Sequence, residues 1–241
     1  MTTFELFAII ILAAAIHASF QLSVSVLTVM SGHAFGKKSS HAHVQSLTAS
    51  FTLGVFVMVA LLLSTTALVA QNLFVNGIPP LVWATLCGLT VGIGVAVWMF
   101  YYRQRTTGTV LWLPRDLADY LSKRARATSM SGEAFGLGLS SVITEALFTA
   151  GPILITALLM LQLSPSNQLL ALITYTLISV LPLLAIIVLV GGGRSLARIQ
   201  RWRETNKRFL QFAAGSALIV LALYLYVEVI ITPISSGVTS L

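Results

Sequence analysis

The sequence predicts an all-α integral membrane protein with six transmembrane helices, and three observations lead to this fold class. Hydrophobic residues make up 57% of the 241 residues and charged residues only 9%, whereas an ordinary soluble domain carries about 25% charged residues. Six apolar segments each reach the length of about 20 residues that a helix needs to cross a bilayer. All lysines and arginines fall in alternate connections between these segments. We therefore expect lipid to be the main solvent of this chain.

The six segments are expected to be helices because none shows the alternating pattern of a membrane-spanning strand. They cover residues 4–30, 46–70, 78–102, 134–162, 167–192 and 209–231. The first segment lacks a preceding cationic region and is too long for the apolar part of a signal peptide. We therefore expect it to remain in the mature protein as the first helix.

The basic residues predict the orientation of these helices. All 14 lysines and arginines lie in the first, third and fifth connections. They are Lys37, Lys38, Arg103, Arg105, Arg115, Lys123, Arg124, Arg126, Arg194, Arg198, Arg201, Arg203, Lys207 and Arg208. Because basic loops stay on the cytoplasmic side, we expect a multi-pass protein of the plasma membrane with both termini outside the cytoplasm. The same location accounts for the net charge of +7 without a nucleic-acid partner.

The order of the segments predicts two halves joined by a linker. Residues 1–102 and 134–241 each hold three predicted helices, and residues 103–133 form the cytoplasmic linker. Within this linker, residues 115–124 have the composition of a short amphipathic helix at the membrane surface. Since three is odd, the second half crosses the membrane in the opposite sense. The layout thus predicts a 3+3 inverted repeat, a common plan of transporters with the substrate site near the midplane.

The opening helices of the two halves carry matched polar stripes. The spacing of 4, 4 and 3 residues occurs at His17, Gln21, Ser25 and Thr28 and again at Ser141, Glu145, Thr149 and Pro152. Steps of this size place side chains on one face of a helix. Polar faces within a bilayer must turn toward protein or water. These residues therefore predict a polar site between the first and fourth helices.

Glu145 and His17 are the ionisable residues that this site would use. Each is the only residue of its type deep inside a predicted span. An ionised side chain at the bilayer centre costs at least about 2.5 kcal/mol, so Glu145 should be paired, hydrated or protonated. The predicted substrate- or proton-binding residues are Glu145, His17, Gln21, Ser25, Ser141 and Thr149. The alternative is that Glu145 and His17 only form structural hydrogen bonds with neighbouring hydroxyl groups.

Prolines and glycines predict where helices bend or pack closely. Gly151 and Pro152 lie inside the fourth segment and Pro182 inside the fifth. Because proline removes a backbone donor and clashes with the preceding turn, these three residues are candidate hinges in discontinuous helices. Plain kinks are the alternative. Glycines at four further positions allow close helix contacts: Gly92, Gly94, Gly136 and Gly138.

Other reactive residues give weaker expectations. His33, His41 and His43 lie in the first cytoplasmic connection; two of them could bind a metal, but the neighbouring lysines repel cations, so a solvated loop is expected. Cys87 is the only cysteine and cannot form an internal disulfide. The sequence contains neither a nucleophile elbow, a phosphate-binding glycine loop nor a His-Glu-x-x-His motif. We therefore expect neither an enzyme nor a bound cofactor.

The layout and three local segments resemble the lysine-exporter superfamily. Residues 135–145 are similar to a helix of its nickel/cobalt-exporter branch, and residues 201–226 resemble the last helix of its electron-conduit branch. Gly151–Pro152 is similar to the glycine–proline pair of the exporter and conduit helices. The resemblance implies the 3+3 inverted repeat and a membrane transport function.

The departures from this family narrow the function. The conduit branch uses a cysteine in each repeat-opening helix, and here both helices lack one, which excludes that thiol–disulfide relay. The nickel/cobalt branch has aspartates near its early histidine; His17 has none, and Ser140 stands where that branch has an acid. We expect a secondary transporter that exports a small polar or amphiphilic solute with proton coupling. A divalent metal-ion exporter and a non-transporting scaffold or assembly factor are the alternatives. Expected partners are membrane lipids and the solute or ion, and a homo-oligomer remains open.

Overall fold

The structure, a computed structural model, describes residues 1–20, 23–36, 40–100, 102–104, 109–111, 115–192, 202 and 205–232. Its helices are α1 (Thr3–Ser19), α2 (Ser23–Gly36), α3 (His41–Leu73), α4 (Pro80–Phe100), α5 (Arg115–Ala127), α6 (Ser131–Met160), α7 (Pro165–Gly191) and α9 (Lys207–Tyr226), which continues into the π-helical turn η1 (Val227–Ile231). Two short strands, β1 (Tyr102–Gln104) and β2 (Thr109–Leu111), form an antiparallel hairpin. The predicted all-α class is confirmed, and the hairpin is a small addition that the apolar pattern did not predict.

The predicted multi-pass membrane protein is also confirmed. Five helical segments of the described chain are long and apolar enough to cross a bilayer: α3, α4, α6, α7 and α9 together with η1. The pair α1 and α2 makes a sixth span if it is counted as one, but its two parts are bent by 47°. The single helix expected over residues 4–30 is therefore divided into α1 and α2, which pass the test for a span only as a bent pair.

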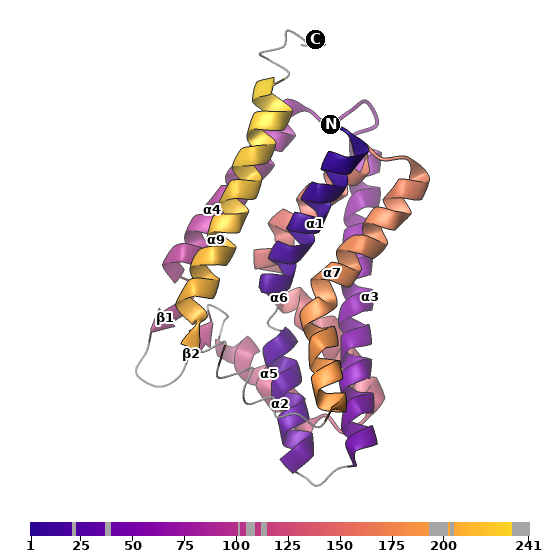
Figure 1. Cartoon of the computed structure of the whole chain (residues 1–241), viewed down its shortest axis with the longest axis vertical. Coiled ribbons are helices and arrows are strands. Elements are labelled where there is room, and N and C mark those ends of the chain that lie inside the picture. The colour runs from indigo at the N-terminus through magenta and orange to yellow at the C-terminus, as the bar shows by residue number, and fades with distance from the viewer. Residues whose placement is uncertain are drawn as a thin grey trace.

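The spans are arranged as a central group and a flanking pair. In the central group α6 packs along α3, while α7 lies against α1 and α3. The flanking pair consists of α4 and α9, which run side by side and touch the central group where α9 meets α1 and α4 meets α6 (Figure 1). The helix α1 begins at the end of the molecule where α9 ends, and α5 and the hairpin lie toward the opposite end (Figure 1).

Each of these two groups contains a close helix crossing at glycine residues. A Cβ atom on Gly138 of α6 would overlap the backbone carbonyl of Phe51 on α3, and one on Gly54 would overlap that of Phe135. In the flanking pair, a Cβ on Gly94 would lie 2.9 Å from the carbonyl oxygen of Gly215. The expected close contacts thus occur at Gly94 and Gly138, because small residues let two helix backbones approach closely. Added Cβ atoms at Gly92 and Gly136 would meet open space.

The helix α5 covers the linker residues over which a short helix was expected. Leu121 and Ala125 are buried, and α5 packs against α2 and α6. Lys123, Arg124 and Arg126 are exposed. One face of α5 therefore covers the end of the helical bundle while the other carries its positive charge.

Candidate functional site

The site begins at the break in the first span. The helix α1 ends at Ser19, and the N–H of Phe20 donates a hydrogen bond of 3.0 Å to the carbonyl of His17. The next helix begins at Ser23. Neither glycine nor proline occurs between His17 and Ser25. A proline or glycine therefore does not account for the break.

Glu145 of α6 stabilises the start of the helix that follows this break. Its Oε1 atom accepts hydrogen bonds from the backbone N–H and from the hydroxyl group of Ser23, the latter at 2.6 Å. Both residues are fully buried. The first N–H groups of a helix have no partner within the helix, and its N-terminus carries a partial positive charge. The carboxylate thus caps α2 from a residue 122 positions away in the sequence.

Two more hydroxyl groups of α6 surround this contact. The Oγ atoms of Ser23 and Ser141 lie 2.9 Å apart, and Ser141 also donates to the carbonyl of Gly138 at 2.8 Å. Because Ser23 donates its single hydroxyl proton to Glu145, the one proton of Ser141 is shared between Ser23 and the carbonyl of Gly138. One turn further along α6, Thr149 donates to the backbone carbonyl of Glu145 at 3.2 Å. We call Ser23, Ser141, Glu145 and Thr149 the glutamate cluster.

His17 lies in a separate hydrogen-bonded pair. Its Nδ1 atom is 2.9 Å from the hydroxyl oxygen of Tyr175 on α7, and the two rings meet edge to face with centroids 5.6 Å apart. Both side chains are fully buried. Within the described part of the chain, the other ring nitrogen, Nε2, has no hydrogen-bond partner. His17 therefore ties α1 to α7 and retains one buried polar atom for a further partner.

Two stacked phenylalanines separate these polar groups. The rings of Phe20 and Phe148 are nearly parallel, at 12°, with centroids 5.9 Å apart. Phe20 contacts Phe148, and the later Ser23 contacts the earlier Glu145, so α1–α2 and α6 run in opposite directions here. His17 precedes Phe20 in the chain, whereas Ser23 follows it. The aromatic pair thus lies between the His17–Tyr175 pair and the contact of Ser23 with Glu145.

The structure brings together only part of the predicted site. Ser141, Glu145 and Thr149 are buried together on α6, as their spacing predicts. Ser25 is exposed and does not reach this group; its carbonyl instead accepts a hydrogen bond from Thr28. The break displaces α2 from the face of a straight helix, so Ser23 occupies the place expected for Ser25. Gln21 lies outside the described residues.

Two residues of the site were absent from the predicted set. Ser23 was missed because the stripe assumed one unbroken helix through residue 30. Tyr175 was missed because an apolar helix with one tyrosine carries no pattern of its own. A tyrosine in the middle of a span nevertheless needs a partner for its hydroxyl group, and this signal could have paired it with His17.

The predicted hinge residues lie in helices without a break. The helix α6 runs through Gly151 and Pro152, and α7 runs through Pro182. A Cβ atom on Gly151 would lie 3.0 Å from the hydroxyl oxygen of Thr90, so this glycine is a close contact between α6 and α4. A hinge role for the three residues stays a prediction.

A second group of buried hydroxyl groups lies nearer the far end of α2. Ser31 lies 3.3 Å from Thr48 of α3, oxygen to oxygen, and both are buried. Thr52, one turn away on α3, is buried too and donates to the carbonyl of Thr48 at 2.9 Å. The contact between α2 and α3 therefore contains buried hydroxyl groups in addition to those beside Glu145.

Metal ligands do not cluster in the described chain. His41 and His43 are exposed, the side chain of His33 lies outside the described residues, and Cys87 is buried as a free thiol. A search of the described residues for three or more histidine, cysteine, aspartate or glutamate side chains around one point found none.

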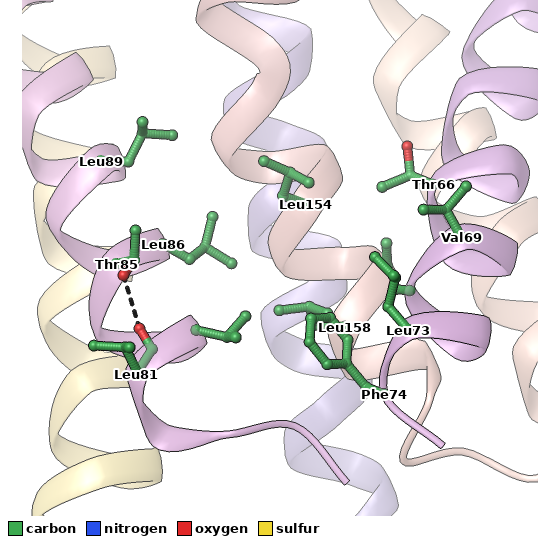
Figure 2. A pocket seen from close by; sticks show the side chains of 13 residues that line it. Thr66, Val69, Leu73, Phe74, Leu81, Thr85, Leu86, Leu89, Leu154 and Leu158 are labelled. Atoms are coloured by element: carbon green, nitrogen blue, oxygen red, sulfur yellow. Dashed lines mark hydrogen bonds between the residues drawn. The ribbon is translucent and has the colours of Figure 1, made fainter. Parts of the chain in front are cut away.

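The structure also contains an apolar pocket of about 520 Å³ between α3, α4 and α6. Its walls come from the end of α3 (Thr66 to Phe74) and the start of α4 (Leu81 to Leu89). Its floor comes from α6, where Leu154 and Leu158 lie between the side chains of α4 and α3 (Figure 2). We call this pocket the apolar groove. Ionisable side chains do not line it.

Comparisons of the chain with protein-family models, with curated proteins and with solved structures found no match. The function is therefore argued from the site alone.

Proposed function

We propose that this protein is a secondary transporter that exports a small polar or amphiphilic solute across the plasma membrane, coupled to protons. The observation that carries the proposal is the contact between Glu145 and the start of α2. Transporters commonly bind substrates and coupling ions where a spanning helix is interrupted, because the ends of half-helices offer unpaired backbone groups and partial charges. Here the break, the acid and several hydroxyl groups occur together inside the bundle.

Protonation of Glu145 would couple proton binding to a movement of α2. Hydrogen bonds to an ionised carboxylate are roughly twice as strong as neutral ones. The ionised side chain therefore holds Ser23 and the N-terminus of α2 against α6. A proton on Glu145 removes the charge, weakens both bonds and releases α2. The hydroxyl groups of Ser23 and Ser141 then become available to the solute.

The pairing of the helices supports the inverted repeat. If the first half corresponds to the second, the broken span α1–α2 matches α6, α3 matches α7 and α4 matches α9. The contact between α1 and α7 then has its counterpart between α6 and α3, and the contact between α1 and α9 has its counterpart between α6 and α4. Three further pairs, α1–α6, α3–α7 and α4–α9, each correspond to themselves. This pairing is expected of a 3+3 repeat such as the lysine-exporter superfamily has, and we propose membership of that superfamily.

The basic residues support the orientation. Exposed cations of α5 and the basic start of α9 lie at the end of the molecule opposite the start of α1 (Figure 1). Because such residues stay on the cytoplasmic side, we propose that both termini are outside the cytoplasm.

The test is a Glu145→Gln variant in proteoliposomes that contain a pH-sensitive dye. A thermal-shift screen of amino acids, amphiphiles and divalent metals first identifies a ligand, because a bound ligand raises the unfolding temperature. Solute-driven proton flux should fall about tenfold or more, because an amide cannot carry the proton. The matched control is Glu133→Gln, an exposed acid in the first turn of the same helix. Unchanged flux in Glu145→Gln would refute the role of this carboxyl group.

A membrane scaffold or assembly factor is the second candidate. It is favoured by the complete burial of Glu145, which suits a permanent structural link, and by the exposed cations of α5, which could bind an acidic partner. The two candidates differ in the hydrogen exchange of the amide groups at the start of α2. If the protein is a transporter, these amide groups should exchange faster at low pH, after correction for the intrinsic rate. If it is a scaffold, the corrected exchange rate should not change with pH.

A further inference from the structure

The apolar groove has the chemistry of a hydrocarbon-binding site. Among the described residues that line it, only Thr66 and Thr85 carry hydroxyl groups. Thr66 donates to the carbonyl of Leu62 at 2.6 Å. Thr85 donates to the carbonyl of Leu81 at 2.8 Å (Figure 2). These groups are satisfied within the helices, as groups facing lipid must be. The groove therefore offers a ligand only van der Waals contacts with apolar walls.

The groove has a closed floor and an open mouth. On α6, Ala157 is fully buried and Leu158 is nearly so. On the rim, Leu73 of α3 and Leu81 of α4 are 69% and 76% exposed. A ligand can thus enter sideways from the surroundings of the bundle, and these surroundings are lipid because α3, α4 and α6 are all candidate spans.

The length of the groove matches one leaflet of a bilayer. From Leu81 to Leu89 the helix α4 rises by about 12 Å, at 1.5 Å per residue. One leaflet contributes about 15 Å of hydrocarbon, half of the core thickness of about 30 Å. The groove begins next to the connection between α3 and α4, where these spans reach the membrane surface.

We propose that the apolar groove binds one acyl chain of a bilayer phospholipid, in the leaflet next to the connection between α3 and α4. This site goes beyond the transport function and does not depend on it. The groove lies where α4 packs near α6 and α3. It therefore lies between the flanking pair α4–α9 and the central group, and we call this place the joint. The acyl chain fills this joint and adds contacts between the flanking pair and the central group.

The test compares two leucine-to-tryptophan variants on α6. Leu154→Trp places a large side chain in the groove, and Leu147→Trp places the same side chain on an exposed part of the helix outside it. Each protein is taken from nanodiscs of phosphatidylethanolamine and phosphatidylglycerol into mild detergent, and retained phospholipid is counted by native mass spectrometry. We expect wild type and Leu147→Trp to retain about one phospholipid per chain. In Leu154→Trp the amount of retained phospholipid should fall about threefold or more.

Three results would overturn the proposal: no retained lipid in wild type, equal retention in all three proteins, or a Leu154→Trp variant that dissociates an oligomer while keeping its lipid. The last result would assign the groove to a second copy of the chain. Folding is checked by the elution volume of the detergent-solubilised protein. If Leu154→Trp does not fold, Leu89→Trp on the opposite wall, a half-exposed position, gives the same readout.

Discussion

The first span of this protein is an interrupted helix, whereas the fourth span is a continuous one. The first is broken between α1 and α2, although neither proline nor glycine lies between His17 and Ser25. The fourth, α6, is a helix of 30 residues that runs through Gly151 and Pro152. Inside a bilayer each backbone group needs a partner. A span can therefore break where another helix supplies that partner, and it can stay whole across a proline when its neighbours hold it in place.

The contacts of the two spans explain the difference. Glu145 supplies an acceptor for the N–H of Ser23. This hydrogen bond stabilises the start of α2 and so offsets the cost of the break. The helix α6 is held against α3 at Gly138 and against α4 at Gly151. The comparison predicts that changes at Gly138 and Glu145 have large effects, whereas a change at Pro152 has a small one.

The largest effect is expected from Gly138→Leu. The new Cβ atom would overlap the backbone carbonyl of Phe51, and a backbone cannot turn aside as a side chain can. We expect the loss of more than about 4 kcal/mol of stability, in the range seen for severe core overpacking and strain. The measurement is the yield of folded protein by size-exclusion chromatography in detergent. Gly136→Leu is the control, because its Cβ would meet open space; equal yields would mean that the crossing of α3 and α6 does not hold α6 in place.

The next largest effect is expected from Glu145→Leu. The substitution removes the acceptor of both donors of Ser23, and an unsatisfied buried donor costs about 1–3 kcal/mol. We expect a stability loss of about 2–4 kcal/mol and faster hydrogen exchange of the amide groups at the start of α2. Glu145→Gln, which keeps an acceptor oxygen, should lose less. Slower exchange in Glu145→Leu would show that the first span prefers to be straight and that Glu145 forces the break.

The composition of the chain sufficed to predict the spans but not the break. Each span is recognised from its own residues, because lipid exposure and length are local properties. The contact of Ser23 with Glu145 joins positions 122 apart. Residues 17–25 contain neither proline nor glycine, so only the folded arrangement shows where α1 ends. The stripe on α6 was predicted correctly because α6 keeps the regular helical period that the prediction assumed.

A smaller effect is expected from Tyr175→Phe. The change removes the hydroxyl group beside Nδ1 of His17 and keeps the ring that packs against the imidazole. The lost bond should cost about 1–2 kcal/mol, because a buried polar atom loses its partner. Thermal unfolding in detergent measures this loss. Tyr120→Phe on the exposed side of α5 is the control and should leave the midpoint unchanged.

The smallest effect is expected from Pro152→Ala. Proline in a helix interior costs about 3 kcal/mol relative to alanine in water-soluble helices. In a span, however, neighbouring helices and local adjustments offset this cost, and α6 already passes through Pro152 as a helix. We expect the unfolding midpoint to rise by an amount equivalent to about 1 kcal/mol or less. A larger rise would mean that Pro152 strains α6 and favours a bent form of this helix. In that case the hinge predicted at Gly151 and Pro152 gains support, and the two spans differ in degree rather than in kind.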